Sequence, residues 1–278
     1  MDAYEVHVGQ DVGGREFVVS TDDLTRYRAG TDTPTAGGAP APALLYHSEV
    51  YRNLSWYLPN LIGNLHARQE WALFEPFAVG DLVRSRVTVV ERYRKRNREY
   101  VVAEVLFTTP EGRWLQRSRT HQSFLAEIPG DELIVDRSRE QRPDRRFIVP
   151  TDGIEAIPTQ TRTISHAMCT AFSGPVANYH TDQVMARALG FPDIVVQGMM
   201  SVCFVAETVS ARFGHGWHHG GTLDVRLVNI VWPNDRLTTH GMIRELVPEG
   251  SRHRALLDVW CAKADGTITV VGTASALC

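Results

Sequence analysis

The segment from Ser173 to Asp182 reads Ser-Gly-Pro-Val-Ala-Asn-Tyr-His-Thr-Asp and is the most informative part of the chain for chemistry. An imidazole exchanges protons near neutral pH, so His180 can act as a general acid or base. Tyr179 can supply a proton or a hydrogen bond, and Asp182 can orient His180 or share its charge. The segment therefore predicts an acid–base site with three catalytic candidates, His180, Tyr179 and Asp182.

Asp182 and His180 also have structural interpretations. Asp182 follows a loop and precedes a helical stretch through Ala188, so we favour it as the N-cap of that helix. His180 could instead be a vestige that packs where the loop meets the helix. Asn178, two residues before His180, could hydrogen-bond a substrate carbonyl.

A second group of candidates lies at Gln197 and Gly198, where a long amphipathic helix is predicted to begin. A helix N-terminus presents unpaired backbone N–H groups and a partial positive charge, which stabilise a developing oxyanion. Gly198 permits close approach of a ligand, and equally close packing with no ligand. Gln197 can add a side-chain donor from the same turn. Asn178, Gln197 and Gly198 are therefore candidates for substrate binding.

The order of these residues resembles the MaoC-like dehydratase and R-specific enoyl-CoA hydratase family. The family pattern reads roughly Ser-Gly-Asp-x-Asn-Pro-hydrophobic-His-x-Asp, then Gly-Phe, then His-Gly-Met at the head of a long helix. Pro175 stands in place of the catalytic Asp, Ala177 in place of the Asn, and Gln197 in place of the second His. The positions that match are Ser173, Gly174, His180, Asp182, Gly190, Phe191, Gly198 and Met199. The resemblance favours the substrate-binding role for Gly198.

The resemblance implies a hydro-lyase that acts on an α,β-unsaturated or 3-hydroxy acyl thioester. In the family the Asp and the His share a water, and Pro175 can neither give nor take a proton, so the catalytic set is non-standard. The alternative is a non-catalytic hot-dog protein that binds an acyl thioester or supports a partner subunit. A related reaction that needs one base, such as thioester hydrolysis, is a third interpretation. The thioester would be carried by CoA or a carrier protein, and no cofactor is implied.

The elements that position these residues are predicted from an internal repeat. Residues 69–122 and 223–276 align without a gap at an offset of 154. Both copies alternate apolar and polar residues with a period of two, which is typical of strands with one buried face. An amphipathic helix precedes each copy, at about 44–58 and about 198–213. The pattern alone indicates a duplicated α+β unit.

The charged stretch 131–150 is the predicted linker between an N-terminal unit, 1–130, and a C-terminal unit, 151–278, that carries the site motif. The family resemblance further implies an α+β tandem (double) hot-dog, in which each antiparallel sheet wraps around a long central helix. Single hot-dog units pair so that their sheets join. A tandem copy can make that pair within one chain.

The composition excludes several classes of partner. A formal charge of −3 and a pI near 6.4 give no pull toward nucleic acid or an anionic membrane. No basic and apolar leader is visible, and no apolar run reaches the ~18 residues of a membrane span. The four cysteines show no Cys-x-x-Cys spacing, which favours free thiols in a cytoplasmic protein. We expect a cytoplasmic homodimer whose partner is the thioester.

Other clusters have simpler interpretations. The three histidines of Gly214–Gly221 are adjacent to no cysteine or carboxylate at ligand spacing, so we predict a loop and no metal. The basic run Arg92–Arg98 predicts a solvated hairpin tip, or contact with the phosphates of CoA. His66 is expected to be structural. Tyr46–Glu49 reads like the segment around His180, but the repeat register does not pair the two, so we treat the likeness as coincidence.

Overall fold

The computed structural model describes residues 6–33, 40–54, 64–96, 98–125, 146–150 and 152–278. Ten strands of the described residues form one antiparallel sheet in the order β1-β3-β4-β5-β2-β7-β10-β9-β8-β6. The elements in chain order are β1 (Asp11–Val18), α1 (Thr21–Thr31), α2 (Glu49–Leu54), β2 (Leu65–Leu73), β3 (Leu82–Lys95), β4 (Arg98–Thr108), β5 (Trp114–Leu125), β6 (Glu155–Thr163), α3 (His166–Ser173), α4 (Gln183–Ala188), α5 (Gly198–Phe213), α6 (His215–His218), β7 (Thr222–Leu227), β8 (Arg236–Glu249), β9 (Arg252–Lys263) and β10 (Ile268–Leu277).

The strands repeat as the sequence predicts. β3 and β8, β4 and β9, and β5 and β10 each begin 154 residues apart. The register of the first hairpin shifts between Val89 and Glu91, and that of the second between Ile243 and Glu245, again at the same offset. The turns match as well, because Gly80 and Asn234 both have positive φ, 96° and 70°. Strand, bulge and turn therefore recur together, which shows that the unit is duplicated.

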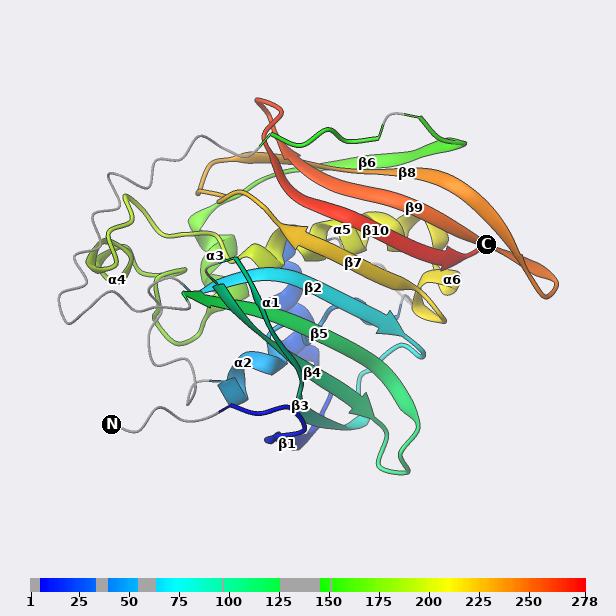
Figure 1. Cartoon of the computed structure of the whole chain (residues 1–278), viewed down its shortest axis with the longest axis horizontal. Helices are drawn as coiled ribbons and strands as arrows, with labels where there is room; N and C mark the ends of the chain where they lie inside the picture. The colour runs from blue at the N-terminus through cyan, green and yellow to red at the C-terminus, as the bar shows by residue number, and fades with distance from the viewer. Residues whose placement is uncertain (1–5, 34–39, 55–63, 97, 126–145, 151) are drawn as a thin grey trace.

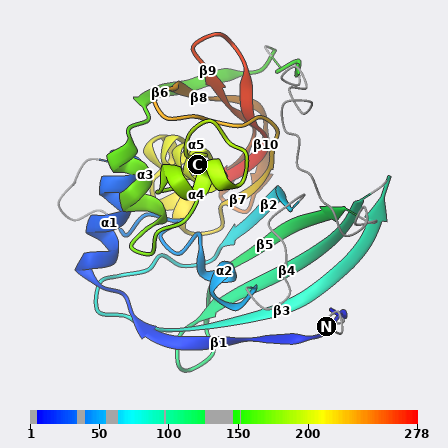
Figure 2. The ribbon, with the colours of Figure 1, turned by 90° about the vertical axis from the view of Figure 1, so that its left-hand side faces the viewer.

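The two units meet at β2 and β7, which pair antiparallel and join the two half-sheets into one. Arg68 on β2 reaches across this seam with a bidentate ion pair to Asp224 on β7, at 2.6 and 2.5 Å. Figure 1 shows β1–β5 below the seam and β6–β10 above it. Seen end-on, the strands of the C-terminal unit curl around α5 (Figure 2). The predicted α+β tandem hot-dog fold is confirmed.

The central helix of the C-terminal unit begins and ends as predicted, at Gly198 and Phe213. It contacts β6 to β10 and is buried on almost every side, as its nearly continuous apolar sequence requires. The largest side chains that it buries completely are Met199, Met200 and Phe204.

The corresponding helix of the N-terminal unit begins later than predicted. Residues 43–48 form turns and α2 starts at Glu49, whereas the apolar spacing predicted a start near Leu44. Residues 55–58 of the predicted helix lie outside the described residues. The physical reason is local, since the Ser48 hydroxyl lies 2.9 Å from Nδ1 of His47 and such short polar side chains compete with helix formation.

The predicted linker is only partly described. Residues 146–150 form no helix or strand, and residues 131–145 lie outside the described residues. The unit boundaries at 130 and 151 stay a prediction.

No helix in the described part of the chain is long and apolar enough to cross a membrane. All four cysteines are free thiols that form no disulfide, as predicted. Cys278 is exposed, and Cys169, Cys203 and Cys261 are buried.

Candidate functional site

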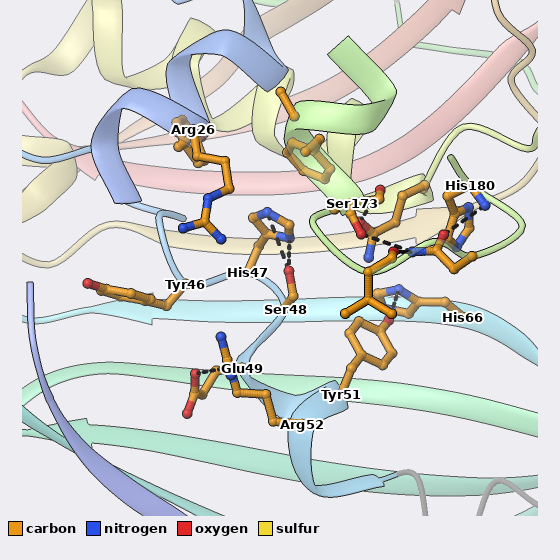
Figure 3. A pocket seen from close by; sticks show the side chains of 18 of the residues that line it. Arg26, Tyr46, His47, Ser48, Glu49, Tyr51, Arg52, His66, Ser173 and His180 are labelled. Atoms are coloured by element: carbon orange, nitrogen blue, oxygen red, sulfur yellow. Dashed lines mark hydrogen bonds and ion pairs between the residues drawn. The ribbon is translucent and has the colours of Figure 1, made fainter. Parts of the chain in front are cut away.

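A cavity of about 650 Å³ is lined by side chains of both units. The C-terminal unit contributes the end of α3, the loop that follows it and the start of α5. The N-terminal unit contributes α1, the turn before α2, α2 itself and parts of β2 and β5. Figure 3 shows His180 and Ser173 on one side, facing His47, Tyr51 and His66 on the other. The cavity therefore exists only because the two units are joined.

His180 is held in one tautomer. Its Nδ1 lies 2.6 Å from the backbone oxygen of Val195, and a carbonyl oxygen can only accept, so Nδ1 carries the proton. Nε2 is consequently the acceptor of the neutral ring. Burial lowers the pKa of His180 to about 4, and the bond to Val195, which favours the charged ring, offsets burial only in part. The imidazole is thus a neutral base at physiological pH.

Two neighbours fix this imidazole in place. The ring of Tyr179 packs against it with centroids 3.9 Å apart. The backbone N–H of His180 donates to Oδ1 of Asn178 at 2.8 Å. The Asn178 amide also donates to the backbone oxygens of Ser173 and Val176, at 3.0 and 2.9 Å. Asn178 lines the cavity, yet these contacts make it the residue that shapes the loop under His180.

The start of α5 also reaches the cavity. Gln197 and Gly198 both line it. The Ser173 hydroxyl donates to Oε1 of Gln197 at 2.9 Å, so the NH₂ end of Gln197 is the one that can donate to a ligand. The Gln197 side chain makes no cap bond to the helix. A Cβ on Gly198 would lie 2.0 Å from Cδ2 of Leu227, so the glycine also permits close packing there.

Asp182 does not line the cavity with the other predicted residues. Its Oδ1 accepts from the backbone N–H groups of Val184 and Met185, at 2.8 and 3.0 Å. These are the bonds of an N-cap on α4, the interpretation that the sequence favoured. A catalytic role for Asp182 stays a prediction to which the structure adds no contact.

Pro175, at the position where the sequence resemblance implies a carboxylate, is exposed and is not part of the cavity lining. The carboxylates that do line the cavity, Asp23 and Glu49, both come from the N-terminal unit. Glu49 is 2% exposed and forms a bidentate pair with Arg15 at 2.8 and 2.7 Å. The Ser85 hydroxyl also donates to it at 2.9 Å. Glu49 is therefore already paired as an ion.

The N-terminal unit supplies histidines that the sequence did not assign to the site. The Tyr51 hydroxyl lies 2.9 Å from Nδ1 of His66, and Nε2 of His66 lies 3.0 Å from Oε1 of Gln69. Because that amide oxygen accepts, Nε2 carries the proton and Tyr51 donates to Nδ1. Burial lowers the pKa of His66 to about 4. His66 is thus a neutral link in a hydrogen-bonded chain on the cavity wall.

His47 connects the two units. Its ring stacks on Phe172 of α3 with centroids 4.0 Å apart and an interplanar angle of 9°. Burial lowers the pKa of His47 to about 3. The likeness of Tyr46–Glu49 to the His180 segment was the one sequence signal that could have found this wall. The two segments are not equivalent in the repeat, but they line the same cavity.

The remaining histidine and arginine clusters lie elsewhere. The loop predicted at Gly214–Gly221 is partly helical instead, because α6 spans His215–His218 and the backbone N–H of His219 donates to the oxygen of His215 at 3.0 Å. His215 and His219 stack at 3.9 Å, and buried His218 lies 3.2 Å from Ser210 Oγ. Within the described ranges, no three His, Cys, Asp or Glu side chains are placed to hold a metal ion. The arginines of the basic run are at the β3–β4 hairpin, where Arg92 and Arg94 each lie 3.6 Å from Glu99.

Comparison with known proteins finds one family model that matches part of the chain and solved structures that match nearly all of it. Residues 150–250 match the model of the MaoC like domain. A solved MaoC-like dehydratase from Phytophthora capsici superposes with a TM-score of 0.73 and 15% identity, covering 97% of this chain and 96% of that one. The full-length peroxisomal multifunctional enzyme type 2 of Drosophila melanogaster gives 0.63 and 18%, covering 95% and 48%.

A conserved hypothetical protein of Mycobacterium tuberculosis, described as a double hot-dog fold, gives a TM-score of 0.61 and 12% identity over 98% of this chain and 96% of that one. Identities this low establish the fold alone. No curated protein sequence matches the chain.

Proposed function

We propose, from the premise that residues 150–250 match the model of the MaoC like domain, that the protein is a hydro-lyase of acyl thioesters. It adds water to an α,β-unsaturated acyl thioester or removes water from the 3-hydroxy form. The observation that carries the proposal is the neutral His180 in the cavity that also contains the start of α5. The carrier of the thioester is CoA or a carrier protein.

The proposed reaction uses His180 as its base. Nε2 takes a proton from water while the water oxygen bonds to the β-carbon, and the double-bond electrons move toward the thioester oxygen. The N-terminus of α5 at Gly198 stabilises the charge that develops on that oxygen. The proton on Nε2 then passes to the α-carbon, which restores the neutral imidazole. His180 alone thereby makes both proton transfers, whereas the family uses an Asp together with the His and has that Asp at the position of Pro175.

The alternative is a hot-dog protein that binds an acyl thioester without converting it, or supports a partner subunit. The exposed Pro175 favours this alternative, because loss of one acid–base partner typically lowers a rate by ~10²–10⁴. Purified protein with short-chain enoyl-CoA distinguishes the two. The proposal predicts loss of the enoyl absorbance and a product heavier by one water. Tight calorimetric binding without any product would support the alternative and overturn the proposal.

A further inference from the structure

The cavity has an open end and a closed end. Arg26 and Arg52, which line it, have side chains that are 47% and 61% exposed. Gln122, on β5, also lines it but is 2% exposed. The bulky carrier of a bound substrate must extend out of the cavity through the exposed side, where the guanidinium groups of Arg26 and Arg52 are open to solvent. The part of the substrate that enters the buried side is therefore the acyl group.

The closed end is walled by hydrogen-bonding side chains. Tyr51 and His66 line the cavity beside the buried Gln122, because Gln122 pairs with His66 across β2 and β5 and the Tyr51 hydroxyl lies 2.9 Å from Nδ1 of His66. Tyr51 and His66 are fixed by the chain that ends on Gln69, whose Oε1 also accepts from the Thr120 hydroxyl at 2.9 Å. The positions of these polar groups are thus set before any ligand binds.

The repeat shows that the fold does not require polar residues there. At the same offset of 154, Gln122 corresponds to Ala276, Thr120 to Ala274, and Gln69 to Leu223. The three residues of the C-terminal unit are buried and apolar and pack in the core beneath α5. The N-terminal unit therefore carries polar groups on a wall that its own duplicate builds from apolar ones.

A wall of this kind selects against a plain alkyl chain. An alkyl group that covers a buried amide or hydroxyl removes it from water and offers no hydrogen bond in return. A carboxylate is also disfavoured. The charged side chains Arg15, Glu49 and Arg52 of the cavity are already paired, since Glu49 is bound to Arg15 and lies 3.4 Å from Arg52, and His66 is neutral.

We propose that the acyl group is short and ends in an uncharged hydrogen-bonding substituent, such as a hydroxyl, which Tyr51 and Gln122 hold at the closed end. The cavity must accommodate this group and the thioester together, which limits the chain length. This inference rests on the proposed function, because His180 and Gly198 define where the thioester lies.

The test compares four enoyl-CoA substrates: hexenoyl, hexenoyl with a terminal hydroxyl, hexenoyl with a terminal carboxylate, and dodecenoyl. We expect kcat/KM for the hydroxylated hexenoyl thioester to exceed that of the plain one by about tenfold or more. The carboxylated and dodecenoyl thioesters should be poorer still. A plain or carboxylated chain that is used as well as the hydroxylated one would overturn the inference.

Two variants locate the preference on the wall. Tyr51→Phe removes one hydroxyl, and Gln122→Ala installs the residue of the C-terminal unit. Each should reduce the preference for the hydroxylated chain by about tenfold, with melting temperatures recorded to confirm folding. Tyr100→Phe is the matched control, because Tyr100 stacks on Tyr93 outside the cavity lining and should leave the preference intact. A preference unchanged in both wall variants would contradict the assignment.

A binding measurement separates this inference from the proposed function. Calorimetry with saturated hexanoyl-CoA and its terminally hydroxylated form needs no turnover. Tighter binding of the hydroxylated form, with no conversion of any enoyl thioester, would keep the inference and overturn the hydro-lyase. Equal affinity for the two ligands would overturn the inference even if hydration is observed.

Discussion

His180 is fixed at both its backbone and its ring. Its N–H donates to Asn178, and its ring donates to the carbonyl of Val195 while packing against Tyr179. One orientation and one tautomer result, with Nε2 left to accept a proton. This is the arrangement that a base needs.

The rate of enoyl-CoA hydration should rise when a carboxylate is introduced at position 175. In Pro175→Asp, a carboxylate stands where the family resemblance implies one, between Gly174 and Val176, which both line the cavity. Acid–base assistance of this kind typically contributes ~10²–10⁴-fold. We expect slow hydration of short unbranched enoyl-CoA by wild type and a gain of tenfold or more in the variant. The measurement is loss of enoyl absorbance. Pro248→Asp, at an exposed proline on β8, is the control. Brisk wild-type turnover, or an unchanged variant, would count against the interpretation of Pro175.

At the scale of the elements, α4 illustrates how a residue close to a site can be structural. Asp182 caps this helix with two backbone bonds, and α4 follows the loop that carries His180. A cap contributes ~1 kcal/mol in typical proteins. The sequence allowed both a cap and a catalytic role, because spacing alone does not show where the carboxylate points.

Substitutions at Asp182 distinguish the two roles. Asp182→Ser keeps a capping oxygen but removes the charge, whereas Asp182→Ala removes both. We expect the serine variant to retain wild-type turnover and the alanine variant to lose ~1 kcal/mol of unfolding free energy in urea. Equal loss of turnover in both variants, at unchanged stability, would instead make the carboxylate catalytic.

The elements also show the limits of pattern reading. The period-two alternation and the Gly80 and Asn234 turns were sufficient to place β3–β5 and β8–β10. The start of α2 was wrong by about a turn, because apolar spacing continues through Tyr46–Ser48 while their polar side chains favour turns. His47 lies in this turn and lines the cavity, so the error fell on residues of the candidate site.

At the scale of the whole molecule, the cavity depends on contacts between residues that are far apart in the sequence, and local sequence patterns do not reveal such contacts. Phe172 stacks on His47 from 125 residues away, and His66 enters from a strand of the other unit. The motif around His180 identified the C-terminal side of the site. The N-terminal side has no motif of its own, and only the joined sheets bring its polar wall opposite His180.

The neutral histidines predict a common acid sensitivity. Burial lowers the pKa of His47 to about 3 and the pKa values of His66, His180 and His218 to about 4, against 6.5 in an unfolded chain. Below pH 6.5 the unfolded state binds more protons, so stability is full above that pH and falls as pH drops toward 4. Each histidine can lower the free energy of unfolding by up to ~2 kcal/mol as the pH falls.

Urea unfolding between pH 7.5 and 4.5 measures this effect. We expect the midpoint to fall steadily below pH 6.5, and the fall to be smaller in His47→Phe, which removes one buried imidazole from the stack on Phe172. A midpoint that is flat to pH 4.5 would show that these rings are not held neutral.

The central claim is that His180 is the base of a thioester hydro-lyase, and its most direct test is single-residue loss of turnover. Wild type, His180→Ala and the control His253→Ala, at an exposed histidine on β9, are compared on a short-chain enoyl-CoA at matched folding by circular dichroism. We predict that hydration falls by at least ~10² in His180→Ala and stays at the wild-type rate in His253→Ala. Full activity in His180→Ala would contradict the account.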